Sequence, residues 1–598
     1  MYNFKIKNIV TNDGTSIVPK GINIIIGPNN SGKSQFLKDI KYILGSNNSF
    51  GKKSIVISNL TYELPDNKND FIIRYGIESK IFRDSNNQYY IRNYSGINSN
   101  DIIINNSISN YLDTGNINIM PNWKDNLDRQ ILNFSERICN AEEILKEGNY
   151  PEGATIHTET YVEYESEKEI VRKNIAGGGG PVYSEIGESV EEFIRIYGNL
   201  FFNYLGTEEK LLLCKRQRKY GLQDNNTNFL SEVQFNSKLL KELAKYTKSM
   251  FKKDLYLDRF SWGDSILFRV GDDFNFIRNA SRENSDVEIK LKDYGTLDSE
   301  GDGLKSFVTN YIALNMNDKN VLLLDEPESF LHPPLAKQLG EIIARSSNEN
   351  KQIFISTHSV DLLKGILNVD KDVNIIRITR DNEINHFNLL EKDKIEKIIS
   401  NPLLSSSNVL NGLFCEKVYI CEAESDEEFY QVLHDKIDSY DSAFFTHGKN
   451  KQTLKDIALS YNDLGIPNFR IYDFDILKDD DFNRALNKFI SDDVKNEYIN
   501  IRKKVNDVLE KRFYTNGGIE KLETVELKET VINMLKELKK MNIIILQKGC
   551  LETCFEDLGI PFTENKVNWF KKSLELINQS SLESIKKSYI YNWIFKRN

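Results

Sequence analysis

The stretch from Gly21 to Leu44, GINIIIGPNNSGKSQFLKDIKYIL, decides how the N-terminal part of this chain folds. It predicts a buried strand, a glycine-containing loop and a helix in direct succession. The loop itself, GPNNSGKS, has the spacing G-x-x-x-x-G-K-S. Its glycines allow backbone N–H groups to wrap around phosphates at the N-terminus of a helix. We therefore predict an ATP site in which Lys33 neutralises the terminal phosphates and Ser34 holds Mg²⁺. The loop residues assigned to ATP are Gly27, Asn30, Gly32, Lys33 and Ser34.

Two later segments supply acids and an imidazole. The segment VLLLDEPES, residues 321–329, predicts a buried strand that ends in Asp325 and Glu326. We expect Asp325 to hold Mg²⁺ through its water shell and Glu326 to polarise the attacking water. In QIFISTHS, His358 follows another buried strand and is expected near the γ-phosphate. Each segment alone fits a surface turn, but together with the loop they favour an ATPase.

The segment LDSEGDGLKSF, residues 297–307, places Ser299, Gly301 and Gly303 ahead of a predicted helix. With this segment in place, the sequence resembles the ABC/SMC/Rad50-like ATPases. The loop, this segment, the two acids, LHPP at 331–334 and the histidine occur in that family's order. The resemblance implies that Ser299, Gly301 and Gly303 contact the ATP of a second copy. It therefore implies a head-to-head homodimer, with a tetramer also open. The segment departs from the usual LSGGQ, which leaves its contacts open.

The order of predicted elements divides the chain into two α/β domains. We predict an ABC-type P-loop ATPase domain over residues 1–400, with a largely helical insertion at about 100–260. Helical periods in the insertion include SVEEFIRIYGNLFFNYL, residues 189–205, and a glycine run at 177–180 interrupts them. A polar stretch at 395–412 predicts the boundary. Strands that alternate with helices then predict a second α/β domain over 412–598.

Acidic residues follow the predicted strands of the second domain. Glu422 ends the strand VYIC, and Asp426 comes four residues later. Asp473 and Asp475 form a D-x-D pattern after FRIY, and Glu552 comes after NIIIL. Carboxylates at strand ends converge at one edge of a sheet and suit Mg²⁺ or Mn²⁺. We expect the D-x-D segment to be extended, so that both carboxylates point to the same side. Two such ions could support phosphodiester cleavage, although any one acidic cluster alone is more often solvated surface.

This pattern resembles the Toprim domain. An ATPase followed by a Toprim domain resembles the OLD-family (overcoming lysogenisation defect) nucleases, which include Gabija-type and retron-associated antiphage defence nucleases. The resemblance implies a metal-dependent DNA endonuclease or nickase whose late catalytic lysine is Lys572, with Lys571 as the alternative. It implies Mg²⁺, Mn²⁺ or Ca²⁺ held by Glu422, Asp426, Asp473, Asp475 and Glu552. It also implies DNA as a partner, and a defence-system protein such as a helicase or a retron reverse transcriptase with its DNA. Ala423 replaces the family's usual glycine, and Cys550 stands where an acid is common.

Composition limits the remaining possibilities. The chain has 598 residues, of which 40% are hydrophobic and 28% charged, as in a globular protein with at least two domains. The apolar runs are strand-length, so we expect no membrane-spanning segment, and the N-terminus lacks a signal-peptide pattern. Six scattered cysteines favour reduced thiols and a cytoplasmic protein. The net charge of −10 gives no support for bulk DNA binding, but a local basic groove would suffice, and KRQRK at 215–219 is a candidate.

Two functions from different classes stay open. The first is an ATP-regulated DNA endonuclease or nickase with an intact set of acids. The second is an ATPase scaffold or sensor whose Toprim-like domain does not cut. A topoisomerase or primase is disfavoured because no residues are left to build a tyrosine-bearing cleavage domain. A nicking assay with Mg²⁺ or Mn²⁺, with and without ATP, separates the first two.

Overall fold

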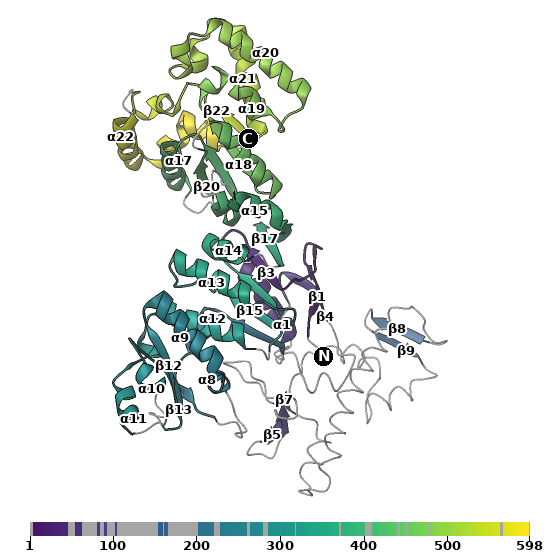
Figure 1. Ribbon diagram of the computed structural model, residues 1–598. Helices are drawn as coiled ribbons and strands as arrows, with labels where there is room; N and C mark the ends of the chain where they lie inside the picture. The colour runs from purple at the N-terminus through teal and green to yellow at the C-terminus, as the bar shows by residue number, and fades with distance from the viewer. Residues whose placement is uncertain are drawn as a thin grey trace. The chain divides into compact units, whose positions relative to one another are not determined.

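The chain divides into two compact units (Figure 1). The first comprises Met1–Ile25, Gly32–Ile376 and Asp381–Phe387, and the second comprises Ile26–Ser31, Arg377–Arg380 and Asn388–Asn598. The computed structural model describes residues 4–45, 54–62, 81–83, 89–91, 102–103, 154–158, 161–164, 201–220, 228–259, 263–278, 285–316, 319–369, 372–400, 409–438, 443–448, 451–478, 480–562 and 566–596. The predicted boundary at 395–412 lies after the start of the second unit at residue 388, and its residues 401–408 are outside the described residues.

A six-stranded sheet has the strand order β10-β15-β16-β3-β17-β18. Its strands are β3 (Ile22–Ile26), β10 (Phe202–Leu205), β15 (Val321–Asp325), β16 (Gln352–Ser356), β17 (Val373–Asp381) and β18 (Ile384–Leu390). β10, β15, β16 and β3 run parallel to their neighbours. Every residue of β3 and β16 is buried, as expected for parallel strands covered on both faces. The predicted strands before the loop, the acids and the histidine are therefore confirmed, and they place the residues that follow them at one sheet edge.

Helices pack around this sheet. α1 (Lys33–Leu44) contacts β15 and β16. α12 (Asp302–Asn315) packs on α13 (Pro333–Ser346), and α13 packs on α14 (Val360–Leu367). Pro333 and Pro334 of the LHPP segment begin α13, where proline suits the first helical turn. These helices connect the segments that carry the predicted site residues.

Smaller elements complete the first unit. One antiparallel sheet has the order β2-β1-β4, with β1 (Ile6–Thr11), β2 (Ser16–Ile17) and β4 (Ile57–Tyr62). Another contains β11 (Gln217–Arg218), β12 (Asp254–Asp258), β13 (Ser265–Gly271) and β14 (Gly295–Thr296). The helices of this region are α7 (Thr207–Leu212), α8 (Phe229–Val233), α9 (Ser237–Phe251), α10 (Asn275–Arg278) and α11 (Ser285–Lys292), of which α9 packs on β12 and α8 on β13. Further short strands are β5 (Ile81–Arg83), β6 (Tyr89–Ile91), β7 (Ile102–Ile103), β8 (Ala154–Thr158) and β9 (Tyr161–Tyr164).

The helix predicted to run to residue 205 is wrong over its last four residues. Residues 202–205 form strand β10, which pairs with β15 as an edge of the six-stranded sheet. Aromatic residues favour strands when a neighbouring strand is available, so the tertiary pairing decides the structure here. Residues 154–164 of the insertion also contain strands, β8 and β9. The glycine run at 177–180 and the predicted helices of 104–153 and 165–200 lie outside the described residues.

The second unit is built on a parallel sheet with the order β20-β19-β21-β22. The strands are β19 (Lys417–Cys421), β20 (Ala443–His447), β21 (Asn468–Tyr472) and β22 (Ile543–Ile545). Its helices are α15 (Lys392–Ser400), α17 (Glu424–Ile437), α18 (Lys451–Asp463), α19 (Asp481–Leu486), α20 (Asp492–Val508), α21 (Val525–Lys540), α22 (Lys566–Gln579) and α23 (Leu582–Lys587). The predicted α/β character of this part of the chain is confirmed.

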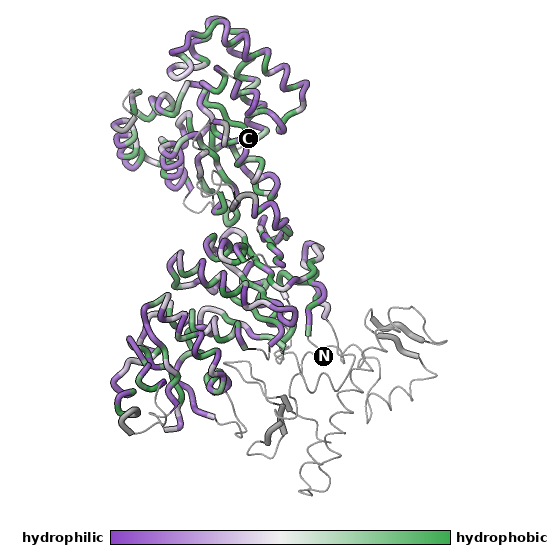
Figure 2. Tube along the Cα trace, viewed as in Figure 1, coloured by the Kyte–Doolittle hydropathy of each residue, from purple (hydrophilic) through white to green (hydrophobic). Residues whose placement is uncertain are grey.

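The core of the second unit joins its first strand to its last helices. Tyr419 of β19 stacks on Phe445 of β20 at a centroid distance of 4.8 Å. Phe429 of α17 lies 5.3 Å from Trp569 of α22, centroid to centroid. These side chains belong to one buried apolar cluster, and in Figure 2 the inner strands are among the hydrophobic parts of the trace. The cluster fixes β19 and β21, so the residues that follow these strands have defined positions.

Candidate nucleotide site and acidic cluster

The loop between β3 and α1 has the backbone that phosphate binding requires. Gly27 has a φ of 144° and Gly32 a φ of 96°, values that L side chains rarely adopt. A Cβ at Gly27 would lie 2.0 Å from the carbonyl oxygen of Ile378, so only glycine fits there. Gly32 is the N-cap of α1 and has no side chain to occupy the helix end. The first N–H groups of α1 can therefore bind an anion.

Asp325 lies at the end of β15 and accepts hydrogen bonds from neighbouring hydroxyl groups. Ser34 Oγ donates to Asp325 Oδ1 over 2.8 Å, and Tyr204 O–H donates to Oδ2 over 3.1 Å. Ser356 Oγ also donates to Oδ1. The loop serine and the strand-end carboxylate thus lie side by side, as predicted for joint handling of Mg²⁺. This donor set of oxygens fits a hard divalent cation.

Lys33 begins α1 with its side chain buried. Only 5% of the residue is exposed. Burial lowers its pKa to about 8, although the nearby carboxylates of Glu326 and Asp325 act in the opposite direction. A poorly hydrated ammonium group next to the glycine loop favours binding of an anionic ligand.

The side chains of Glu326 and His358 lie next to each other. Glu326 follows β15 in the left-handed region, with a φ of 48°. His358 Nε2 lies 3.5 Å from Glu326 Oε1. Burial lowers the pKa of His358, Lys33 lowers it further, and Glu326 acts in the opposite direction. A neutral imidazole beside a carboxylate can orient a water molecule or a phosphate oxygen.

Glu328 connects the turn after β15 to the segment after β16. Its Oε1 accepts a hydrogen bond from Thr357 Oγ1 over 2.5 Å and another from the His358 backbone N–H over 3.1 Å. Burial raises the pKa of Glu328. The carboxyl group therefore fixes the backbone of the residue that carries the imidazole. Sequence reasoning did not single out this residue, although it belongs to the same DEPES segment.

Ser299, Gly301 and Gly303 lie just before and at the start of α12. Ser299 ends a short 3-10 helix (Leu297–Ser299), and its Oγ donates to the Thr296 carbonyl over 2.7 Å. Gly301 is the N-cap of α12. A Cβ at Gly303 would lie 2.6 Å from the Phe330 carbonyl oxygen, so this glycine lets α12 approach the turn after β15. Their predicted contact with the ATP of a second copy stays a prediction.

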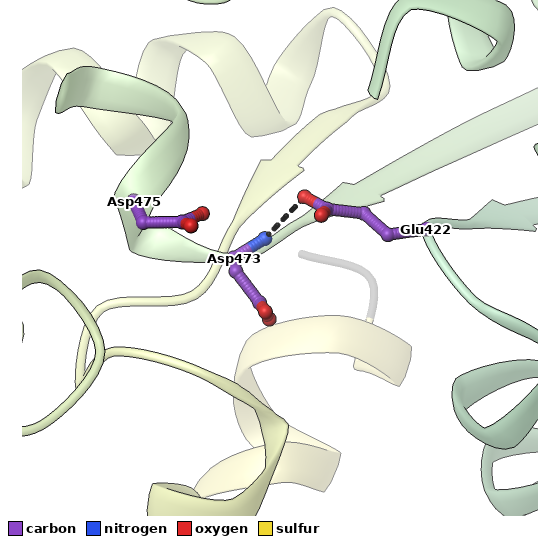
Figure 3. Close-up of side chains that lie close together, drawn as sticks. All are labelled: Glu422, Asp473 and Asp475. Carbon is purple, nitrogen blue, oxygen red and sulfur yellow. Dashed lines mark hydrogen bonds between the residues drawn. The ribbon is translucent and has the colours of Figure 1, made fainter. Parts of the chain in front are cut away.

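The second unit gathers three of the predicted acids into one group. Glu422 follows β19, Asp473 follows β21, and Asp475 lies in a short 3-10 helix (Phe474–Lys478). One carboxylate oxygen of each lies within 4.8 Å of the others (Figure 3). The Asp473 backbone N–H donates to Glu422 Oε1 over 3.0 Å. The expected extended D-x-D segment is wrong, because the 3-10 turn rather than strand alternation brings Asp475 to the group.

Like charges and burial dominate the electrostatics of this acidic cluster. Burial raises the pKa of Glu422 to about 7; Lys451 acts in the opposite direction, and Asp475 raises it again. Burial, followed by Glu422 and the other nearby carboxylates, raises the pKa of Asp473 well above its usual range. Carboxylates held this close repel one another unless a cation lies between them. The oxygen donors and their spacing fit a divalent cation such as Mg²⁺ or Mn²⁺.

Asp426 and Glu552 lie near the acidic cluster but outside its closest group. Asp426 is in the first turn of α17, where its Oδ2 accepts from the Ala423 backbone N–H over 3.3 Å. Glu552 is buried in a short 3-10 helix (Leu551–Thr553). Both carboxylates are close enough to raise the pKa of Asp473. The five predicted acids therefore share one region, with three within reach of one ion.

The lysine that contacts the acids was not among the predicted site residues, although a helix was predicted after residues 443–448. Lys451 begins α18 and forms an ion pair with Asp475. Its charge also acts on the pKa of Glu422, as Glu422 does on that of Lys451. Lys572 and Lys571, the predicted candidates, have exposed side chains on α22. The catalytic role expected of Lys572 stays a prediction, and Lys451 is the lysine at the acidic cluster.

Residues 1–363 match the family described as the AAA ATPase domain. The chain belongs to this family. The match covers the loop, Asp325, Glu326 and His358, so the nucleotide site described above lies within the AAA ATPase domain. The predicted fold class, α/β with a P-loop ATPase, is confirmed.

Curated relatives of this AAA ATPase-domain protein match shorter stretches. The Old nuclease of Escherichia phage P2 is 27% identical over 172 residues, which cover 27% of this chain and 29% of that protein. The uncharacterised protein MJECL11 of Methanocaldococcus jannaschii is 31% identical over 68 residues, covering 11% of this chain and 60% of that protein. The chain thus spans less than a third of the nuclease that it resembles. This similarity supports an OLD-like ATPase.

Solved structures similar to this AAA ATPase-domain protein include SMC head domains. One from Pyrococcus furiosus, bound to the C-terminal domain of ScpA, has 14% identity and a TM-score of 0.29, covering 66% of this chain and 98% of that chain. The head domain from Thermotoga maritima has 12% identity and a TM-score of 0.26, covering 65% and 100%. Among the described helices, none has the length and apolar character needed to span a membrane.

Two side chains at the nucleotide site of this AAA ATPase domain were missed because they lie in the segment interpreted as an insertion. Tyr204 is in β10, and its aromatic neighbours were the signal for a strand. Lys210 is in α7, and its Nζ donates to the carbonyl oxygens of Asp325 and Glu326 over 2.8 and 2.5 Å. Burial lowers the pKa of Lys210 to about 8. No local pattern in the sequence distinguishes Lys210 from a surface lysine.

Proposed function

We propose that this AAA ATPase-domain protein hydrolyses ATP and that its second unit cleaves or nicks DNA with the help of divalent metal. The observation that carries the proposal is the group formed by Glu422, Asp473 and Asp475, whose ligand atoms lie within 4.8 Å of one another at the carboxyl ends of parallel strands. The similarity to the Old nuclease of Escherichia phage P2 supports the same function. A Toprim-like fold for this unit and a role in antiphage defence belong to this proposal.

In this proposal Glu422, Asp473 and Asp475 hold Mg²⁺ or Mn²⁺, with Asp426 and Glu552 alongside. The metal would supply a water molecule of lowered pKa and shield the anionic phosphodiester. Lys451 brings a positive charge to the same place and could stabilise the charge that develops on the phosphate. The raised pKa values of Glu422 and Asp473 mean that the acids ionise most readily when a cation is present.

The test compares Asp473→Asn with Asp492→Asn on supercoiled plasmid in Mg²⁺ or Mn²⁺. Asp492 is an exposed acid in the first turn of α20, so it controls for the loss of one negative charge. We expect Asp473→Asn to lose cleavage while its ATPase turnover stays within about twofold, because the nucleotide site is built from other segments. Asp492→Asn should cleave like the wild type.

Equal cleavage by Asp473→Asn and the wild type would show that the acids do not hold the catalytic ion. No cleavage by the wild type, with or without ATP and with every DNA form tested, would favour the alternative of an ATPase scaffold or sensor. The ion pair between Lys451 and Asp475 supports the scaffold or sensor alternative, because a lysine can neutralise such a cluster of acids without any metal.

We further propose self-association through the ATPase units, with Ser299, Gly301 and Gly303 completing the site of a second copy. The supporting observation is that Ser299 lies just before the N-terminus of α12, with Gly301 as the N-cap and Gly303 in the first turn. Light scattering should give a dimer or tetramer in the presence of ATP and Mg²⁺. A monomer at every concentration tested would refute this part of the proposal.

A further inference from the structure

Lys210 is a buried lysine at the nucleotide site that has no assigned role in ATP hydrolysis. It lies in α7, directly after the edge strand β10, and none of its surface is exposed. Its Nζ donates to the Asp325 carbonyl oxygen over 2.8 Å and to the Glu326 carbonyl oxygen over 2.5 Å. Hydrogen bonds from a charged donor are among the stronger ones in proteins. Lys210 therefore holds the two carbonyl groups on either side of the Glu326 Cα.

The backbone at Glu326 needs such support. Its φ of 48° lies in the left-handed region, which non-glycine residues rarely adopt. The Glu326 N–H donates to the Ser356 carbonyl over 2.9 Å, and the Glu326 carbonyl accepts from Ser329 Oγ over 2.7 Å. Ser329 belongs to the turn itself, whereas Lys210 comes from a distant segment. Strained conformations persist at functional sites only when their surroundings fix them in several ways.

Lys210 also contacts the helix that begins at Gly301. Its backbone carbonyl accepts from Thr309 Oγ1 of α12 over 2.7 Å. Asn310 of the same helix donates to the Pro327 carbonyl over 3.0 Å. The position of α12 and the turn that carries Glu326 are therefore linked through Lys210 and through the adjacent asparagine.

We propose that Lys210 is a positioning residue for ATP hydrolysis, which fixes the left-handed turn at Glu326 and so sets the direction of the Glu326 carboxylate. This role concerns the ATPase unit alone and does not depend on the proposed nuclease activity. Lys210 orients the group that acts on water and has its own ammonium occupied by two carbonyls. Its loss should therefore affect turnover rather than nucleotide affinity.

Lys351 provides a matched control within the same unit. It is also buried, with 4% of its surface exposed, and its Nζ donates to the carbonyl oxygens of Leu314 and Met316 over 2.7 and 2.8 Å. Those carbonyls lie at the far end of α12 from Gly301. Lys351→Met therefore removes the same kind of buried interaction without touching the turn after β15.

The experiment measures ATPase kcat, ATP Kd and Tm for Lys210→Met and Lys351→Met. We expect Lys210→Met to lower kcat about 10- to 100-fold, as misplacement of a catalytic group does, with ATP Kd within about threefold of wild type. Lys351→Met should lower Tm and keep kcat within about twofold. Adding Lys210→Met to Glu326→Gln should cause no further loss, because both changes remove the same contribution.

Three results would overturn the proposal: a wild-type kcat in Lys210→Met, an equal loss of kcat in Lys351→Met, or a loss in Lys210→Met that is explained by weaker ATP binding. Partial recovery of kcat in Lys210→Arg, which keeps the charge and the donors, would support it. If Lys210→Met does not fold, Lys210→Gln takes its place, because its shorter, uncharged side chain removes the two hydrogen bonds that the ammonium donates. A wild-type kcat in folded Lys210→Gln would then refute the positioning role of the ammonium.

Discussion

Replacing Lys33 by methionine should stabilise the nucleotide-free protein while it abolishes ATP binding. Burial lowers the pKa of Lys33 from 10.5 to about 8, so the charged form costs free energy in the folded state at neutral pH. At about 1.4 kcal/mol for each tenfold change in proton affinity, this shift corresponds to at most about 3.5 kcal/mol. Methionine fills a similar volume and has no charge to desolvate. A buried group that is needed for its ligand therefore destabilises the protein until the ligand arrives.

The expected result is a Tm for nucleotide-free Lys33→Met that is roughly 2 to 5 °C above that of wild type at pH 7. MgATP should raise the Tm of wild type and leave that of Lys33→Met unchanged, because only a binding-competent folded state is stabilised by ligand. Lys38, exposed on the same helix, supplies the control Lys38→Met, which should change neither quantity.

The pH dependence of stability tests independently whether the buried Lys33 ammonium destabilises the folded protein. Between pH 8 and 10.5 the folded protein has already released the Lys33 proton, whereas the unfolded chain still binds it. The unfolded state then binds more protons, so the free energy of unfolding of wild type rises with pH in this window relative to Lys33→Met. Lys210 titrates in both proteins and cancels from the comparison. The reasoning is refuted if Lys33→Met has the lower Tm at pH 7, or if the difference widens above pH 8.

The two sites give four further predictions. Glu326→Gln should retain ATP but slow its hydrolysis about 100-fold or more in a steady-state phosphate-release assay, because the carboxylate that orients water is lost. Without metal, the stability of wild type should fall as pH rises from 4.5 to about 7, because the folded-state pKa of Glu422 is raised and the unfolded chain ionises first. Mn²⁺ should raise the Tm of wild type at pH 7 and not that of Asp473→Asn, as differential scanning fluorimetry can show. Lys451→Met should reduce plasmid cleavage about tenfold or more, and the same assay on Lys572→Met tests the catalytic role that the resemblance implies for Lys572.

The sequence was sufficient to predict the positions of those site residues that depend on a single strand or helix. Gly27 to Ser34 follow the buried strand β3, Asp325 ends the largely apolar strand β15, and Glu326 follows it. A mostly apolar run of that length indicates a buried strand or a buried helix. Once the strands are parallel neighbours, the residues at their carboxyl ends must converge. The same reasoning placed Glu422 and Asp473 together, and the structure shows their carboxylates in one group.

The residues that were missed depend on packing between distant segments. Tyr204 and Lys210 contact Asp325 only because β10 pairs with β15 in the sheet. The sequence of residues 201–212 does not indicate which strand β10 pairs with. The same holds for Lys451, because its contact with Asp475 requires α18 to begin at the sheet edge where β21 ends. Sequence periodicity describes the structure of a segment and not its neighbours, so lysines without a motif cannot be ranked by it.

The two buried lysines of the nucleotide site differ in whether their ammonium group can bind a phosphate. Lys210 donates to two backbone carbonyls, and its side chain is fully enclosed, so an incoming phosphate cannot displace these contacts without opening the turn at Glu326. Lys33 begins α1 beside the glycine loop, where helix N–H groups also point toward an anion. Removing the charge of Lys33 should therefore weaken ATP binding, and removing the charge of Lys210 should lower kcat. Measuring ATP Kd and kcat for Lys33→Met and Lys210→Met side by side separates the contribution to binding from the contribution to turnover. Each variant serves as the control for the other.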